Sequence, residues 1–571
     1  MLDLSRLPKP YPRRFVPQNA DMGDWAQIEP LLDELERRSP KNGQELEQLL
    51  LDFSELASAI YEEGAVRRIR MTCQTDNEEY KKAFLHFVEN IEPKLKPRLH
   101  QFRVKYVQTA ARKELPQARY LVFDRSTVNA VELFREENVP LETEATKLGQ
   151  KYQTISGAQT VHFDGREQTL QQMAKYLEET DRTLRQSAWE KSEERRLQDR
   201  DALNALYDEL IEIRQQIARN AGFANYRDYV FRARERFEYT PEDCFRYHQA
   251  VERHIVPLMR QLQRERQEKL GLKELRPWDL SVDVEGRPPL RPFGNAQQLI
   301  DGCQKIFSQL DSELAEQFRQ MAELNLFDLE SRKGKAPGGY QATLAERRLP
   351  FIFMNAVGRD GDLRTMLHES GHAFHTMATR QEHFWPYRHA PTEFAEVASM
   401  SMELLSKPYW TVFYTEDEAQ RSSQEHLRGI VSLLAWVATI DAFQHWIYTH
   451  PRHTVAEREA YWLELRRRFG GIESWAGYED AQKNFWQRQL HLYLYPFYYI
   501  EYGIAQLGAL QLYARAKSDP REALTAYKRA LALGGSRPLP ELFKAAELKF
   551  DFGEETVKRA AELLRAELLM S

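Results

Sequence analysis

Residues 363–380 read LRTMLHESGHAFHTMATR and contain an H-E-x-x-H motif that runs from His368 through Glu369 to His372. On a helix, residues four apart are separated by about 40° of rotation and one turn of rise, so two imidazoles at this spacing can face one ion. Glu369 lies about 100° round from His368, where it can reach a water on the metal without binding the ion. The motif therefore predicts a zinc site on a helix, with His368 and His372 as ligands and Glu369 as a catalytic carboxylate.

The residues around the motif favour an interior helix over a helix that carries two ordinary histidines. Gly371 is a poor helix former and would destabilise the helix unless a substrate or a neighbouring backbone approaches it closely. Apolar side chains that can pack against a core occur on both sides of the motif, at Leu363, Met366, Leu367, Ala373 and Phe374. We therefore expect a buried catalytic helix with a close contact at Gly371.

A catalytic zinc needs a third protein ligand and one open position. In the extended motif H-E-x-x-H-x-x-G-x-x-H, the third histidine would fall on Ala378, so the sequence excludes that class of site. His375 follows His372 by only three residues and would point partly off the ligand face. We expect His375 to have a structural or supporting role.

A second helix is predicted within residues 391–403, PTEFAEVASMSME, beginning near Pro391 or Thr392. A carboxylate from this helix would complete the metal site where the second helix crosses the first. Spacing alone does not choose between Glu393 and Glu396, and each can equally be an ordinary solvated glutamate.

The segment HESGH followed by EFAEVASMSMELL resembles the M3 family of zinc metallopeptidases, the thimet oligopeptidase and oligoendopeptidase F group, and in particular its shorter bacterial oligoendopeptidase F-like members. The resemblance implies that Glu396, in the segment FAEVAS, is the third zinc ligand, with one Zn²⁺ per chain. It extends to GGYQATLAERRLPFIFMN and to HLYLYPFYYIEYGIA, so that it covers roughly residues 330–510. A further likeness lies upstream, in the segment NAGFANYRDYVF.

An aromatic cluster follows the two predicted helices and contains His491, Tyr493, Tyr495, Tyr498, Tyr499 and Tyr502. Most tyrosines in such a cluster fill cores and interfaces. The resemblance implies instead that His491 and Tyr498 donate hydrogen bonds to the oxyanion that forms when a peptide is attacked, and that Tyr495 and Tyr502 contact the substrate. The choice among Tyr495, Tyr498 and Tyr502 for the transition state stays open.

These residues predict metal-assisted peptide hydrolysis, in which a zinc-activated water is the nucleophile and Glu369 first accepts and later delivers its proton. Gly338 and Gly339 precede a predicted strand that begins at Tyr340, and the two glycines would leave a backbone edge on which an extended peptide can pair. A simple turn explains the two glycines equally well.

The periodicity of apolar residues predicts a mainly helical protein. Residues 44–69 and 170–218 show helical spacing, residues 276–293 carry loop signals, and short apolar runs at residues 340–344 and 349–355 predict one small sheet. We expect an amino-terminal helical region in residues 1–200 and a catalytic region in residues 201–571, together forming one body. The resemblance implies an elongated zincin-type fold with a small β-sheet beside the active-site helix and a deep substrate channel that admits short unfolded peptides.

The composition is that of an ordinary globular protein of 571 residues, with 42% apolar residues and a formal net charge of −6. These values exclude a disordered chain and give no support to nucleic-acid binding. The three cysteines, far apart in sequence, favour a reducing compartment. The first twelve residues have no signal-like apolar core, and the most apolar run, residues 430–440, is too short to cross a bilayer.

We therefore expect a cytoplasmic zinc endopeptidase that acts on oligopeptides as a monomer or weak dimer, with no nucleic-acid or membrane partner. Two alternatives stay open at this stage. One is a zinc carboxypeptidase or aminopeptidase with the same motif, and the other is a helical protein that binds peptides without cleaving them.

Overall fold

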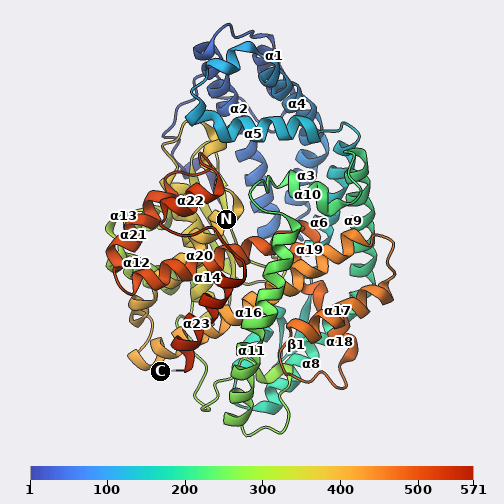
Figure 1. Ribbon diagram of the computed structural model, residues 1–571, viewed down its shortest axis with the longest axis vertical. Coiled ribbons are helices and arrows are strands. Elements are labelled where there is room, and N and C mark those ends of the chain that lie inside the picture. Colours follow the sequence, from blue (N-terminus) through green and yellow to red (C-terminus); the bar gives the residue numbers. More distant parts are fainter. Residues whose placement is uncertain (1, 570–571) are drawn as a thin grey trace.

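Helices carry most of residues 2–569, which the computed structural model describes. The molecule is elongated, and its amino-terminal helices gather at one end of the long axis (Figure 1). The Asn42 side chain accepts a hydrogen bond from the Glu45 backbone N–H and so caps the helix that was expected at residues 44–69. The amino-terminal helices are α1 (Trp25–Arg37), α2 (Gly43–Cys73), α3 (Glu78–His86), α4 (Glu92–Gln108) and α5 (Gln117–Leu133).

The middle of the chain is helical where this was expected, and it also contains a sheet that was not expected. The helical spacing at residues 170–218 belongs to three α-helices, with breaks after the 3₁₀ turn that follows α7 and again at Asp199. A two-stranded hairpin, which the sequence analysis did not expect, precedes them. These elements are α6 (Asn138–Gly157), β1 (Thr160–Phe163), β2 (Arg166–Thr169), α7 (Leu170–Met173), α8 (Arg182–Gln198), α9 (Arg200–Asn220), α10 (Tyr226–Ala233) and α11 (Pro241–Lys269).

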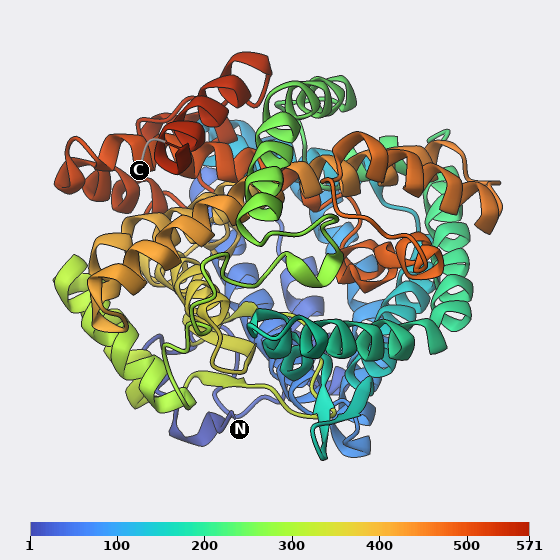
Figure 2. The same ribbon diagram turned by 90° about the horizontal axis from the view of Figure 1, so that it is seen from below.

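Residues 276–293 form the expected loop, in which a 3₁₀ turn buries Trp278 against the body of the protein. Two helices follow it, α12 (Ala296–Leu310) and α13 (Ser312–Glu323). Seen from below, α12, α13 and the carboxy-terminal helices lie on one side of the molecule and α8 and α9 on the other (Figure 2).

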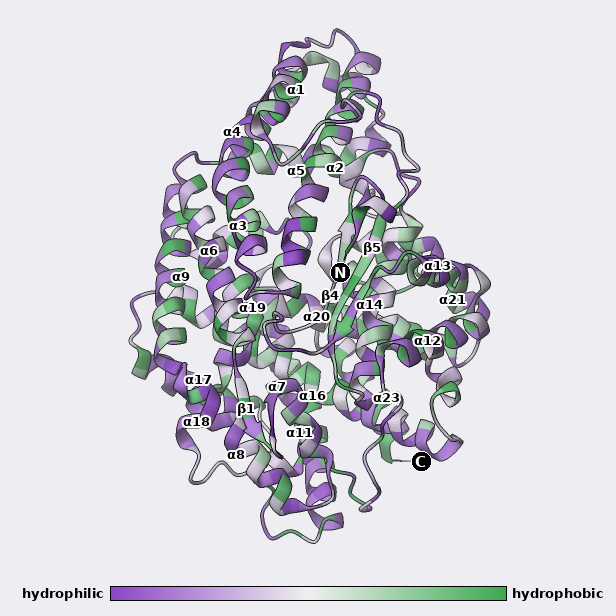
Figure 3. Ribbon diagram, turned by 180° about the vertical axis from the view of Figure 1, so that it is seen from behind, coloured by the Kyte–Doolittle hydropathy of each residue, from purple (hydrophilic) through white to green (hydrophobic). Residues whose placement is uncertain are grey.

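The two predicted strands join a third, which the sequence analysis did not predict, in a sheet of the order β3 (Phe327–Glu330), β5 (Leu349–Ala356), β4 (Tyr340–Leu344). Central β5 runs parallel to β3, with Phe327 opposite Ile352, and antiparallel to β4, with Ala342 opposite Phe351. Strand β5 is apolar along most of its length and lies beside the motif helix (Figure 3). Within the described residues, β4 pairs on one side only, so its other backbone edge is open.

The motif lies on α14 (Asp360–Ala378), and the five apolar residues that flank it are at most 1% exposed. The expected interior helix is therefore confirmed. The second predicted helix begins at Thr392, as expected. The remaining helices are α15 (Thr392–Leu405), α16 (Glu416–Thr449), α17 (Val455–Phe469), α18 (Glu479–Lys483), α19 (Leu490–Leu494), α20 (Tyr499–Ala516), α21 (Pro520–Leu531), α22 (Leu539–Ala545) and α23 (Glu554–Leu569).

Helix α16 is long and apolar enough to cross a membrane by length and composition alone. However, 78% of its most apolar window is buried inside the protein, which is the situation of a core helix. The main hydrophobic core contains residues from both sides of the predicted boundary at residue 200, for example Tyr152 and Tyr207. The division into two regions at that position stays a prediction.

Candidate active site

Helices α14 and α15 approach each other closely at Gly371. A Cβ atom at this position would lie 2.6 Å from both the Ala398 carbonyl oxygen and the Ser399 Cα, closer than real Cβ contacts. The contact that was expected at Gly371 is therefore with a neighbouring backbone. Because a side chain would push the helices apart, glycine here allows α15 to carry its carboxylates up to the motif histidines.

Three side chains converge across this crossing. The Nε2 atoms of His368 and His372 lie 3.2 and 3.4 Å from Oε2 of Glu396. One ligand atom from each of the three residues lies within 4.8 Å of the other two. Two imidazole nitrogens and one carboxylate oxygen are a donor set that zinc prefers, so the residues present fit the metal that the sequence predicts.

Glu393, the other carboxylate that spacing could not exclude, points elsewhere. Its Oε1 accepts a hydrogen bond of 2.7 Å from the Tyr239 hydroxyl, and it is not part of the converging group. His375 is also outside that group and is buried, and burial lowers its pKa to about 3. The structure thus brings Glu396, and neither Glu393 nor His375, to the motif histidines.

A second layer of side chains fixes the orientation of His368. Its Nδ1 lies 2.7 Å from Oε1 of Glu403, and Oε2 of Glu403 lies 2.9 Å from Nε2 of His426 on α16. Burial opposes ionisation of Glu403, but the hydrogen bonds from the two histidines lower its pKa to about 2. A carboxylate that accepts the Nδ1 proton of His368 leaves Nε2 free to bind a metal. The sequence analysis missed Glu403, although its position seven residues after Glu396 places it on the same helix face.

Glu369 is 5% exposed, and its Oε2 has no hydrogen-bond partner among the described residues. Burial raises the pKa of Glu369, while the nearby charges of His368 and His372 oppose this. A Cβ atom on Gly339 would lie 3.5 Å from Oε1 of Glu369, so the chain just before β4 runs directly past this carboxylate. The free carboxylate oxygen is the feature that a proton acceptor requires.

The two glycines before β4 are exposed. Gly338 has a φ of +90°, which favours glycine, and its carbonyl oxygen accepts a hydrogen bond of 2.8 Å from the Asn355 side chain. Tyr340 is half-buried, and its hydroxyl lies 2.6 Å from the Thr72 hydroxyl on α2. The sequence prediction of a free edge beside the metal site is compatible with this arrangement.

The aromatic cluster contains a hydrogen-bond chain that runs in one direction. The indole N–H of Trp436, which can only donate, lies 3.0 Å from Oε1 of Gln489. The amide nitrogen of Gln489 must then face Nδ1 of His491, at 2.9 Å, and donate to it. This assigns the proton of neutral His491 to Nε2, which lies 3.2 Å from the Tyr502 hydroxyl oxygen. Burial lowers the pKa of His491 to about 4, so the ring is neutral at neutral pH.

The three candidate tyrosines have different partners. The Tyr498 hydroxyl donates to Oε1 of Glu396, the predicted ligand carboxylate. The Tyr502 hydroxyl receives the Nε2 proton of His491, which leaves its own O–H free to donate. The Tyr495 hydroxyl accepts from the guanidinium of Arg68 on α2, a residue that the sequence did not single out. Only long-range packing joins Arg68 to this cluster, so no local pattern could have found it.

The segment that precedes Tyr498 is held in a strained conformation. Phe497 has a φ of +63°, which costs a residue other than glycine roughly 1–2 kcal/mol. Its N–H donates to Oε1 of Gln444 at 2.6 Å, and its carbonyl oxygen accepts from the buried guanidinium of Arg236. These two buried partners offset the strain and set the position of the next residue, Tyr498.

The site residues predicted from the sequence line one cavity of about 1020 Å³. The motif residues, His491 and the three tyrosines share its wall with Gly338, Gly339 and Tyr340. The cavity continues past them to side chains of α8 and α17, including Arg196 and Arg466. The structure thus collects every site residue predicted from the sequence around a single cavity.

Glu393 generates a prediction about stability, because burial, followed by the charge of Glu501, raises its pKa from 4.5 to about 7. A carboxyl whose pKa is raised on folding destabilises the protein increasingly as the pH rises from 4.5 through 7. Glu393→Gln should remove this penalty of about 3.5 kcal/mol at most, since one pKa unit corresponds to about 1.4 kcal/mol. The thermal midpoint of the variant, measured without metal, should exceed that of the wild type by more at pH 8 than at pH 5. An equal difference at the two pH values would contradict the assignment.

Comparison with known proteins places this geometry in a family. The family model described as peptidase family M3 matches residues 175–562, and the model of the peptidase M3 N-terminal domain matches residues 17–134. Oligopeptidase PepF of Bacillus subtilis (strain 168) is 27% identical over 309 residues, which cover 52% of this chain and 44% of the relative. Group B oligopeptidase PepB of Streptococcus agalactiae serotype III (strain NEM316) is 24% identical over 315 residues, covering 54% and 51%.

The chain therefore spans about half the length of the curated relatives it matches. The fold agrees over a longer stretch. The solved structure of PZ peptidase A with inhibitor 2 superposes with a TM-score of 0.93 at 27% identity and covers 98% of this chain and 99% of that one. The resemblance and the mainly helical, elongated fold predicted from the sequence are confirmed, and the chain belongs to peptidase family M3.

Proposed function

We propose that this protein is a zinc-dependent endopeptidase that hydrolyses internal peptide bonds of short unfolded oligopeptides. The observation that carries the proposal is the convergence of two imidazoles and the Glu396 carboxylate beside Glu369, whose buried Oε2 has no hydrogen-bond partner in residues 2–569. This group lies in the wall of a large cavity, next to an open strand edge. Membership of family M3 supports the same assignment.

His368, His372 and Glu396 would hold the zinc, and three protein ligands leave a position open for other groups. When bound there, zinc supplies Lewis acidity toward a water molecule and a peptide carbonyl. Glu403 accepts the proton on Nδ1 of His368, which orients Nε2 toward the position that the metal would take.

Glu369 is proposed as the general base and acid. Its free Oε2 accepts a proton from the attacking water, and the same carboxyl then delivers that proton to the leaving amine. Burial keeps its pKa above the ordinary value of a glutamate, which makes the carboxylate a stronger base toward the attacking water.

Tyr502 is proposed to stabilise the oxyanion of the tetrahedral intermediate, because its O–H is the free end of the chain that begins at Trp436. In this assignment His491 acts by holding Tyr502, since its Nε2 proton points at the Tyr502 oxygen. Tyr498 is proposed to fix Glu396, to which it donates a hydrogen bond. Tyr495 contributes to the cavity wall, where it is held by Arg68.

An extended peptide is proposed to pair with the open edge of β4, which begins at Tyr340 directly after Gly338 and Gly339, where the chain passes Glu369. Main-chain pairing recognises any extended peptide, whereas a folded protein has its strands already paired. A cytoplasmic location and a monomeric or weakly dimeric state stay predictions from the sequence.

An internally quenched fluorogenic peptide with both termini blocked tests the function. Wild-type protein should cleave it, and a chelator should abolish cleavage. Glu369→Gln should lower kcat/KM by about 10²–10⁴-fold, the usual contribution of general acid–base catalysis, while zinc content stays unchanged. Glu393→Gln is the matched control, since this nearby buried carboxyl faces Tyr239, and it should remain active. Cleavage of free-ended peptides only would show an exopeptidase, and zinc binding without cleavage would show a binding protein.

The three tyrosine variants to phenylalanine separate the proposed roles. Tyr502→Phe should lower kcat by about 10²-fold, as expected for loss of one oxyanion donor, with zinc retained. Tyr498→Phe should weaken zinc binding by about 10-fold or more, because Glu396 loses its orienting hydrogen bond. Tyr495→Phe should have the smallest effect on kcat. These assignments fail if Tyr498→Phe retains zinc fully and lowers only kcat, since Tyr498 would then act on the reacting carbonyl.

A further inference from the structure

A second group of metal-ligating side chains lies between α11 and α16, outside the cavity described above. Cys244 and His248 are four residues apart on α11, and Asp441 and His445 are four residues apart on α16. Each pair therefore occupies one face of its helix, as the motif histidines do on α14. All four side chains are at most 5% exposed.

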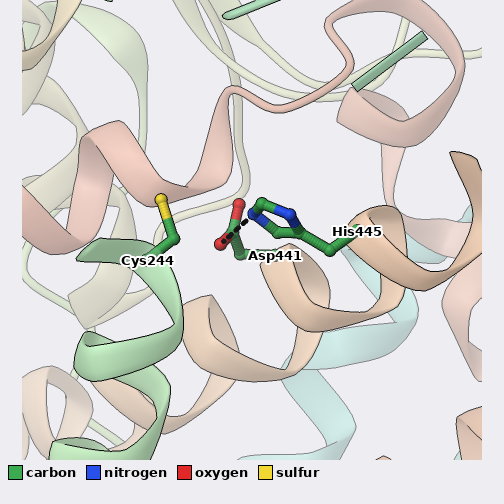
Figure 4. A group of neighbouring side chains, drawn as sticks. All are labelled: Cys244, Asp441 and His445. Carbon is green, nitrogen blue, oxygen red and sulfur yellow. Dashed lines mark ion pairs between the residues drawn. The ribbon is translucent and has the colours of Figure 1, made fainter. Parts of the chain in front are cut away.

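The other three side chains surround the Asp441 carboxylate. Nε2 of His248 lies 2.8 Å and Nε2 of His445 lies 3.3 Å from Oδ2 of Asp441. One ligand atom from each of Cys244, Asp441 and His445 lies within 4.8 Å of the other two. Figure 4 shows that Cys244 and His445 approach the carboxylate from its two sides.

The cluster is incompletely satisfied as a hydrogen-bond network. Oδ1 of Asp441 and both ring nitrogens of His445 have no hydrogen-bond partner among the described residues. Leaving a buried polar atom without a partner costs about 1–3 kcal/mol, and more when the group is charged. Arg236, which faces Cys244, is already paired with Glu501 at 2.9 Å. A cation placed among the four side chains would give a partner to Oδ1 of Asp441 and to one ring nitrogen of His445.

We propose that Cys244, His248, Asp441 and His445 form a second metal site that takes a zinc-like divalent cation. One sulfur, two imidazole nitrogens and one carboxylate oxygen are donors that favour zinc over magnesium or calcium. When the metal binds, the Cys244 thiol releases its proton to solvent, and the resulting thiolate binds the metal. Thiolate and carboxylate together carry two negative charges, which the divalent cation balances.

The position of the cluster indicates a structural role. Gln444, which binds the Phe497 N–H, lies between Asp441 and His445 in sequence, and the His445 ring is 5.3 Å from the Phe497 ring. A metal here ties α11 to the part of α16 that supports the Tyr498 segment. The Phe245 ring packs against His445 at 4.9 Å and is 36% exposed, so the site lies only one side chain below the surface.

Substitution with cobalt distinguishes this site from the predicted catalytic site, whose three ligands contain only nitrogen and oxygen. Metal-free protein equilibrated with Co²⁺ should show a thiolate-to-cobalt charge-transfer absorption in the near ultraviolet. Cys244→Ser should abolish the absorption, whereas His372→Ala should retain it because it disrupts only the other site. Cys73→Ser and Cys303→Ser are matched controls at the other two buried cysteines and should retain the absorption.

Metal content gives an independent measurement on zinc-loaded protein. The wild type should hold two zinc ions per chain, and Cys244→Ser, His445→Gln and His372→Ala should each hold one. Cys244→Ser should keep its peptide hydrolysis, because the site touches no predicted catalytic group. If the variants fail to fold, the zinc content and the cobalt absorption of the wild type decide the proposal. A single zinc per chain together with no thiolate absorption would overturn the proposal, as would an absorption that survives Cys244→Ser.

Discussion

The close crossing of α14 and α15 at Gly371 is the constraint on which the candidate active site depends. A ligand set divided between two helices can face one ion only if the helix axes approach closely at that point. Here the backbone of Ala398 and Ser399 occupies the space that a side chain would fill. The helix-weakening effect of glycine is thus offset by a contact that no other residue permits. The 3.2 and 3.4 Å separations of Glu396 from His368 and His372 follow from this approach.

Around that crossing, hydrogen bonds fix the positions of the histidine protons. The direction of each chain of hydrogen bonds is set by one group that can only donate or only accept. The ionised Glu403 can only accept, so it assigns the Nδ1 proton of His368. The Trp436 indole can only donate, so it determines the orientation of Gln489 and then the tautomer of His491. Both chains are at least partly buried, where a lower dielectric strengthens each hydrogen bond and makes a wrong orientation costly. Binding and catalytic atoms are therefore oriented before any ligand arrives.

The sequence predicted the parts of this arrangement that are encoded locally. Two histidines one helical turn apart, apolar flanks and a strand bounded by glycine all appear within short windows, and a helix start near Pro391 or Thr392 was correctly predicted. The choice of Glu396 over Glu393 came from resemblance, because periodicity does not reveal where two helices cross. The partners Glu403–His426, Trp436–Gln489 and Arg68–Tyr495 required the fold, since each joins different elements. The β1–β2 hairpin was missed because its strands, with polar residues such as Arg166 and Glu167, lack the apolar runs that predicted β4 and β5.

Helix α16 carries side chains that support the first proposed metal site and side chains that form part of the second. Its His426 supports Glu403 behind the first site, its Gln444 holds the strained Phe497 before Tyr498, and its Asp441 and His445 form half of the second cluster. These residues extend over almost 20 positions of a helix that is largely buried. A rotation or shift of α16 would therefore disturb His368 and Tyr498 together. A metal that joins α16 to α11 would oppose such a movement without contacting the substrate. This role would account for a buried cysteine, two histidines and an aspartate in a core where apolar residues would otherwise be more stable.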